Sequence, residues 1–209
     1  PGGDRPQPLT RAAGGVQRPE RAGPAGAVLA QWGAMTHMHV AGSIHADATS
    51  GVMITRFIPG AATMSPVAFR ARRGSPARAG QAFARLHGSG ARFPARFELF
   101  AMIDDYLRLL SGKDVALPPG YHDVLHDAES VRAALSARTL PLAPCHCDPL
   151  CENFLDTGNR MWIVDWEYSG MNDPMWDLGD LSVEAGFDAG QEAEMMQAYF
   201  GHAPKPQDL

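Results

Sequence analysis

Two polar residues lie at the open end of a predicted β-hairpin, where their side chains could share a ligand. The apolar segments 153–155 and 161–164 flank an Asp-Thr-Gly-Asn-Arg run whose residue types favour a tight turn. With the turn centred near residues 158–159, Asn153 and Asp165 are expected to face each other. Facing positions of a hairpin lie about 4.5–5.5 Å apart, so an amide oxygen and a carboxylate would meet here.

This pair of side chains suits a metal ion that prefers oxygen ligands. Mg²⁺ is such an ion, and it usually keeps waters and substrate phosphates in its coordination shell. Asp148 lies five residues before Asn153, on the loop that enters the hairpin. A carboxylate there could accept the proton of an attacking hydroxyl while the metal neutralises a transferring phosphoryl group. The pattern therefore indicates phosphoryl transfer.

The order of these residues resembles the catalytic loop of kinases. The run His146-x-Asp148-x-x-x-x-Asn153 is similar to the kinase pattern of His-x-Asp followed, after four residues, by Asn. Asp165 stands where the metal-binding aspartate follows in kinases, although Asp-Trp-Glu-Tyr replaces the Asp-Phe-Gly of protein kinases.

That variant, with the run at 169–178, resembles bacterial choline/ethanolamine kinases within the wider aminoglycoside phosphotransferase superfamily. Segment 55–60, Thr-Arg-Phe-Ile-Pro-Gly, resembles the hinge between the two lobes in that group. The resemblance covers roughly residues 50–201. It implies an α+β, protein-kinase-like fold with a mostly helical C-terminal lobe and an incomplete N-terminal lobe.

The resemblance also implies a role for each matching residue in a reaction that uses ATP and Mg²⁺. Asp148 is expected to be the catalytic base toward the substrate hydroxyl. Asn153 and Asp165 are expected to hold Mg²⁺ that bridges the ATP phosphates. His146 is expected to order the catalytic loop, and Asp177 to anchor it from the helix beneath.

The expected substrate is a small amine alcohol such as choline or ethanolamine, whose cationic head needs carboxylates and aromatic ring faces. The hinge residues Phe57 and Ile58 are expected to offer backbone contacts to adenine. The expected contacts to the cationic head are Glu167, Tyr168, Trp176 and Glu184.

Helices with no chemistry of their own are expected to pack around this site. Ser65-Pro66 and Ser75-Pro76 each place a capping hydroxyl before a proline at the first helical position. A β-branched run closed by Pro59-Gly60 predicts a strand at 51–58. Apolar spacing predicts further helices at about 75–87, 97–110, 121–135, 175–184 and 188–200.

The domain organisation follows from these elements. Residues 1–50 are interpreted as a poorly specified remnant of an N-lobe that could be disordered, since 16 of the first 27 are Gly, Pro or Ala. Residues 51–60 form the hinge strand, and residues 61–209 form the C-lobe with the catalytic hairpin at 145–168. Both lysines of the chain follow the hinge, so the kinase lysine that positions ATP has no match. The chain is therefore expected to be truncated at both ends.

Composition excludes some partners. A net charge of −5 leaves no basic field for nucleic acid, and no apolar run approaches the roughly 18–20 residues that span a bilayer. Three cysteines crowded between residues 145 and 151 make a poor disulfide framework, which favours a cytoplasmic location. ATP and the amine alcohol are the expected partners, and the sequence leaves the oligomeric state open.

Several alternatives stay open. The substrate could be an aminoglycoside, or the chain could be an inactive pseudokinase or binding module, which the absent lysine favours and the intact motif residues disfavour. The three cysteines and His146 could bind zinc, although their spacing fits no common zinc motif. The polar residues could also be ordinary turn and cap residues.

Overall fold

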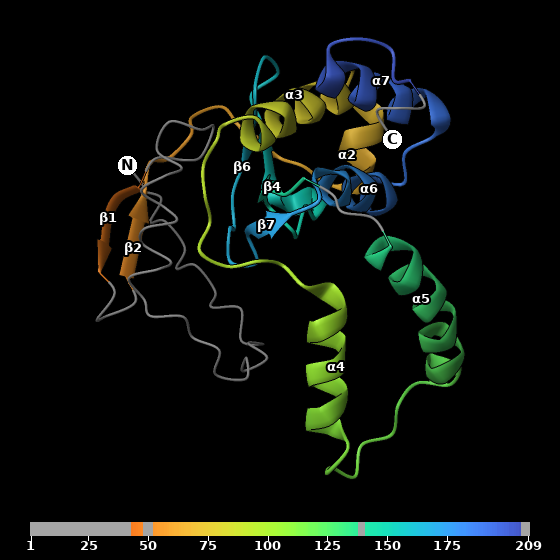
Figure 1. The fold of residues 1–209 in the computed structure, drawn as a ribbon. Coiled ribbons are helices and arrows are strands. Elements are labelled where there is room, and N and C mark those ends of the chain that lie inside the picture. Colours follow the sequence, from red (N-terminus) through yellow and green to blue (C-terminus); the bar gives the residue numbers. More distant parts are fainter. Residues whose placement is uncertain (1–42, 48–51, 138–140, 206–209) are drawn as a thin grey trace, which may run out of the picture.

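The computed structural model describes residues 43–47, 52–137 and 141–205 of the chain. Helices and short strands mix along it, which confirms the predicted α+β class (Figure 1). The helices are α2 (Pro66–Ala71), α3 (Ser75–His87), α4 (Leu99–Leu110), α5 (Tyr121–Ser136), α6 (Pro174–Ala185) and α7 (Ala189–Phe200), with a 3-10 turn, η1, at Cys151–Asn153. None of these helices is long and apolar enough to cross a membrane.

The described strands form small antiparallel sheets. They are β1 (Ser43–Asp47), β2 (Val52–Thr55), β3 (Ala62–Thr63), β4 (Ala143–Cys145), β5 (Phe154–Asp156), β6 (Met161–Ile163) and β7 (Gly170–Asn172). β1 pairs with β2, β5 pairs with both β3 and β6, and β4 pairs with β7. β1 belongs to the range 1–50, and the other residues of that range lie outside the described part of the chain.

The predicted hairpin is present as β5 and β6, with a register that differs by one residue from the expected one. Its turn is short, and the Thr157 N–H donates to the Arg160 carbonyl at 3.0 Å. Because of that turn, Val164 rather than Asp165 lies opposite Asn153, and the Val164 N–H donates to the Asn153 carbonyl at 2.9 Å. The expectation that Asn153 and Asp165 face each other as a strand pair is therefore wrong.

One of the two predicted serine caps is confirmed. Ser65 Oγ accepts a hydrogen bond from the Ala68 N–H at 3.2 Å and caps α2. The cap predicted at Ser75 is wrong, because Gly74, with a left-handed φ of 75°, is the residue that precedes α3. The buried Ser75 hydroxyl instead donates to the Phe69 carbonyl at 2.6 Å and ties α3 to α2.

The hydrophobic core lies between α3, α6, α7 and the β5–β6 hairpin. Phe154 of the hairpin packs edge-on against Phe69 and Phe83, with ring centroids 5.3 and 5.7 Å away. Burying a side chain of this size stabilises the fold by about 1.5–3 kcal/mol. Gly80 lets α3 and α7 approach closely, because a Cβ there would lie 2.2 Å from the Met195 carbonyl oxygen. The core thus fixes the hairpin that carries the candidate site.

Helices α4 and α5, residues 99–136, form what we call the α4–α5 arm, which extends away from the core (Figure 1). Neither helix has a buried residue. Arg132 of α5 joins them, with its guanidinium 2.7 Å from the Asp104 carboxylate and 5.4 Å from the centre of the Phe100 ring. The arm is therefore held by surface contacts rather than by a core.

Candidate active site

The loop between β4 and β5, residues 146–153, carries most of the predicted catalytic motif. Asp177, fully buried on α6, accepts the His146 N–H at 2.7 Å and the Cys147 N–H at 2.8 Å. Cys147 has a left-handed φ of 67°, which costs a non-glycine residue about 1–2 kcal/mol. The carboxylate therefore holds the loop in a strained conformation, and these are the contacts that an anchoring role for Asp177 requires.

His146 links the loop to the segment that follows β6. Its ring is buried, and Nε2 lies 2.9 Å from the Val164 carbonyl oxygen. The same ring packs edge-on against Trp166, with centroids 4.9 Å apart. Because Asp165 lies between these two contact points in the chain, His146 connects the candidate base to the candidate metal ligand.

Asp148 and Asp165 lie near enough to influence each other. Burial raises the pKa of Asp148, the nearby His146 opposes this shift, and the Asp165 carboxylate adds to it. Asp148 is half-buried and Asp165 is exposed, with a left-handed φ of 61° that turns its backbone out of the strand. The charge of Asp165, at this bend, thus acts on the Asp148 carboxyl.

Asn153 faces the same loop from η1. Its Nδ2 donates to the Asp148 carbonyl at 2.9 Å, so the amide oxygen is the atom that could bind a cation. An amide oxygen with a nearby carboxylate fits the donors that Mg²⁺ takes. The residues present therefore fit this ion, and metal binding by Asn153 and Asp165 stays a prediction.

A cavity of about 610 Å³ lies beside the segment that follows Asp165. It is lined by residues 95–98, one face of α4 and residues 167–169. Glu167 and Tyr168 line it, as a substrate site would require. α4 was expected to be only a packing element, yet Met102 and Tyr106 form the opposite wall. A large apolar and an aromatic residue on a helix with no buried side chain were the available signal.

The other expected substrate contacts lie outside that cavity's lining. Trp176 packs its ring against Phe97 at 5.3 Å and donates Nε1–H to the Cys147 carbonyl at 3.4 Å, so it supports the catalytic loop. Glu184 is exposed on α6. Burial of Asp180 is the largest cause that raises the pKa of Asp180 to about 6, and the charge of Glu184 is the next.

The hinge residues lie where the chain leaves β2. Phe57 is 82% exposed and Ile58 is half-buried. The adenine contacts stay a prediction.

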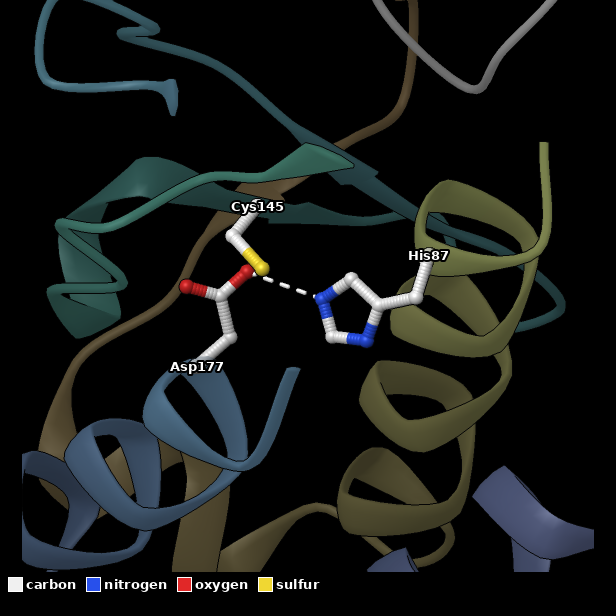
Figure 2. A group of neighbouring side chains, drawn as sticks. All are labelled: His87, Cys145 and Asp177. Atoms are coloured by element: carbon white, nitrogen blue, oxygen red, sulfur yellow. Dashed lines mark hydrogen bonds and ion pairs between the residues drawn. The ribbon is translucent and has the colours of Figure 1, made fainter. Parts of the chain in front are cut away.

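The cysteines do not form the zinc site that the sequence leaves open. All three are free and buried, and burial raises the pKa of each thiol, that of Cys151 to about 11. A zinc-binding thiol must lose its proton, which these surroundings oppose. In the described residues, the side chains close enough to share an ion are instead His87, Cys145 and Asp177 (Figure 2).

Comparison with known sequences places this chain among phosphotransferases. Residues 16–208 match the profile of the phosphotransferase enzyme family. Protein LicA of Haemophilus influenzae is 31% identical over 148 residues, which cover 66% of this chain and 41% of LicA. The chain thus spans about half, or less, of the length of the curated relatives it matches.

Comparison with solved structures gives the same answer. A choline/ethanolamine kinase family protein from Mesorhizobium loti is 64% identical with a TM-score of 0.80, over 91% of this chain and 64% of that one. The choline kinase LicA from Streptococcus pneumoniae is 23% identical with a TM-score of 0.74, over 86% and 63% of the two chains. A LicA structure in complex with AMP, also 23% identical, has a TM-score of 0.71 over 88% and 62%. These matches confirm the predicted kinase-like fold and the predicted resemblance.

Proposed function

The chain belongs to the phosphotransferase enzyme family, and on that premise we propose that it transfers the γ-phosphoryl group of ATP to the hydroxyl of a small amine alcohol, choline or ethanolamine. The observation that carries the proposal is the catalytic loop itself. Asp177 folds the loop through two backbone hydrogen bonds, and the fold brings Asp148 near Asp165. A base beside a metal ligand is what phosphoryl transfer needs from a protein.

Asp148 acts in this proposal as the base that takes the hydroxyl proton. Its pKa, raised by burial, brings it closer to neutral pH, where a base transfers protons most effectively. Asn153 and Asp165 would hold Mg²⁺, which supplies neutralisation of the charge on the transferring phosphoryl group when it is bound. Asn153 also fixes the loop through its bond to the Asp148 carbonyl. His146 joins the loop that carries Asp148 to the segment that carries Asp165, through its contact with the Val164 carbonyl.

The nucleotide would lie between this loop and the hinge. A family neighbour has been solved with AMP, which supports nucleotide use by the fold. The backbone at Phe57 and Ile58, immediately after β2, is where we place the adenine ring. The hinge and the loop would then hold opposite ends of the same ATP molecule.

The cavity beside Tyr168 supports an amine as the acceptor substrate. Its lining carries the carboxylates of Glu98, Asp105 and Glu167 beside two arginines, together with aromatic rings. An aromatic ring face attracts an alkylated ammonium group, and a carboxylate neutralises it. Glu167 and Tyr168 are therefore the substrate contacts we propose. The relative that is 64% identical is a choline/ethanolamine kinase family protein, which supports these two amines as the first candidates.

A second candidate is a binding role without turnover. The printed chain has two lysines, Lys113 and Lys205, and both follow the hinge. A kinase normally uses a lysine before the hinge to position the ATP phosphates. The intact Asp148, Asn153 and Asp165 argue for turnover, because a binding module has no use for a base beside a metal pair.

The test is a Mg²⁺-dependent assay of ADP formation with choline, ethanolamine and an aminoglycoside as separate acceptors. The account predicts turnover with choline or ethanolamine that needs Mg²⁺ and is lost in Asp148→Ala. Asp123→Ala, an exposed carboxylate of the α4–α5 arm, is the matched control and should keep full activity. Faster turnover with the aminoglycoside would show that the acceptor is an aminoglycoside and not choline or ethanolamine. Absence of turnover with every acceptor, from folded protein, would favour the binding role.

A further inference from the structure

A chain of buried hydrogen bonds runs from α7 to the catalytic loop. The Tyr199 hydroxyl on α7 lies 2.9 Å from His87 Nδ1 at the end of α3. The other ring nitrogen, Nε2, lies 3.0 Å from Asp177 Oδ2 on α6, the contact drawn as a dashed line in Figure 2. Asp177 in turn accepts the N–H groups of His146 and Cys147. Two residues far from the loop in sequence therefore reach it through one carboxylate.

The Asp177 carboxylate sets the direction of its contact with His87. An ionised carboxylate only accepts hydrogen bonds, so Nε2 of His87 donates to it. Burial, with smaller contributions from nearby acidic groups, raises the pKa of the Tyr199 hydroxyl to about 12, so the hydroxyl keeps its proton and shares a hydrogen bond with Nδ1 of His87.

The Asp177 carboxylate needs all of these donors. It is fully buried, and a buried carboxylate is tolerated only when it is hydrogen-bonded. Oδ2 accepts from His87 and from the His146 N–H, while Oδ1 accepts from the Cys147 N–H. Without the imidazole, the carboxylate can turn toward other donors or take up water. Cys147, held in its left-handed conformation by the same carboxylate, would then be free to relax.

We propose that His87 and Tyr199 are positioning residues, which fix the orientation of Asp177 and through it the conformation of the catalytic loop around Asp148. Their effect on catalysis rests on the proposed function, whereas their effect on the loop does not. The inference makes α7, which contributes nothing to the motif, part of what sets the site's geometry.

His87 and Asp177 could also be read as part of a metal site, since their ligand atoms and Cys145 Sγ lie within 4.8 Å of one another. The contacts favour hydrogen bonding. The Cys145 thiol donates to the Asn172 carbonyl at 3.5 Å, and burial raises the pKa of that thiol. Nε2 of His87 and both carboxylate oxygens of Asp177 already have partners.

The experiment is amide hydrogen exchange on the whole chain, compared among wild type, Tyr199→Phe, His87→Leu and His87→Gln. His87→Leu should speed exchange of the His146 and Cys147 amides by about 10- to 100-fold, as expected for loss of one hydrogen bond to a charged group, and Tyr199→Phe should speed it by a smaller factor, because the bond it removes joins the hydroxyl to His87 and not to the carboxylate. His87→Gln should restore protection, because its side-chain N–H can replace Nε2. Tyr121→Phe, at the start of α5, is the matched control and should change nothing.

Kinetics give the second measurement. In the active protein, Tyr199→Phe should lower kcat by a larger factor than it changes KM for ATP, because the loop that carries Asp148 is disturbed while the proposed adenine contacts at the hinge are not. Exchange that rises equally across α3, α6 and the loop would reduce His87 and Tyr199 to packing residues and overturn the proposal. Unchanged loop exchange in both variants, or one equivalent of metal that is lost in His87→Gln, would overturn it too. If no acceptor is phosphorylated even by wild type, the proposed function fails while the exchange result still decides this inference.

Discussion

The catalytic loop and the α4–α5 arm are held in opposite ways. The loop is fixed by a fully buried carboxylate and a buried imidazole, and its strand hairpin packs into the core. The arm has no fully buried residue and is joined across its two helices by the half-buried Arg132–Asp104 pair. Both contribute to the candidate site, because α4 forms one wall of the cavity. The loop that carries the proposed base is therefore held by buried groups, while the cavity wall on α4 is held by surface contacts.

The largest expected difference between the two regions comes from one substitution made in each. Arg78 of α3 donates two hydrogen bonds, at 2.9 and 2.7 Å, to the fully buried Asp156 of the hairpin. Arg78→Met should lower the free energy of unfolding by about 3 kcal/mol, because it leaves a buried carboxylate short of partners. Arg132→Met, in the arm, should leave urea unfolding indistinguishable from wild type. Equal losses in the two variants would remove the distinction between the regions.

A smaller effect is expected where the two regions meet at the cavity. Tyr168→Leu should raise KM for the amine about 3- to 30-fold, the range for loss of a cation–π contact, with little change in kcat. Tyr168→Phe keeps the ring face and should keep KM near the wild-type value. Initial rates across amine concentrations measure this, and Tyr121→Leu in the arm is the control. A KM unchanged in Tyr168→Leu would place the amine elsewhere.

A half-buried carboxylate on α6 should make stability depend on pH. Burial, and then the charges of Glu184, Asp177 and Asp148, raise the pKa of Asp180 to about 6. A raised pKa means that the folded state favours the protonated form, so this contribution to stability is present below pH ~4 and is lost as pH rises through about 6.

Asp180→Asn should therefore be more stable than wild type at pH 7.5, by roughly 1 kcal/mol after allowance for solvent screening. The difference should shrink at pH 4.5. Urea unfolding at the two pH values measures it, with Asp123→Asn in the arm as a variant that should show no such dependence. A stabilisation that is the same at both pH values would show that titration of Asp180 is not its cause.

The smallest expected effect is local and leaves global stability unchanged. The segment 111–120 between α4 and α5 is exposed along nearly its whole length, so brief digestion with proteinase K should cut there before it cuts the loop at 146–153. Mass spectrometry of early fragments from the described part of the chain identifies the sites. Earlier cleavage within 146–153 would mean that the anchored loop is the more mobile region.

Local sequence patterns predicted the hairpin, the helices and the cap at Ser65, because each depends on neighbouring residues. The hairpin register was missed by one residue, because a turn centred between residues 158 and 159 pairs Asn153 with Val164 and not with Asp165. The order of Asp148, Asn153 and Asp165 predicted phosphoryl transfer through its resemblance to the kinase catalytic loop, and the roles of these residues stay a prediction.

Contacts between distant parts of the chain could not be predicted in this way. His87 and Tyr199 are 112 positions apart, and neither lies in the motif that they support. The wall that α4 gives to the cavity depends on how the arm leaves the core, which periodicity within the helix does not encode. In this molecule a short stretch of sequence is enough to predict the candidate reacting residues. The residues that hold them in place are distant in the sequence and are found only in the structure.

The most direct test of the account is the rate of ADP formation by Asp148→Asn, measured with saturating ATP, Mg²⁺ and the preferred amine. Asn keeps the shape of the side chain and removes the base, so kcat should fall by about 10²- to 10⁴-fold while thermal unfolding stays close to that of wild type. A folded Asp148→Asn protein that keeps wild-type kcat would contradict the central claim that the anchored loop presents Asp148 as the base.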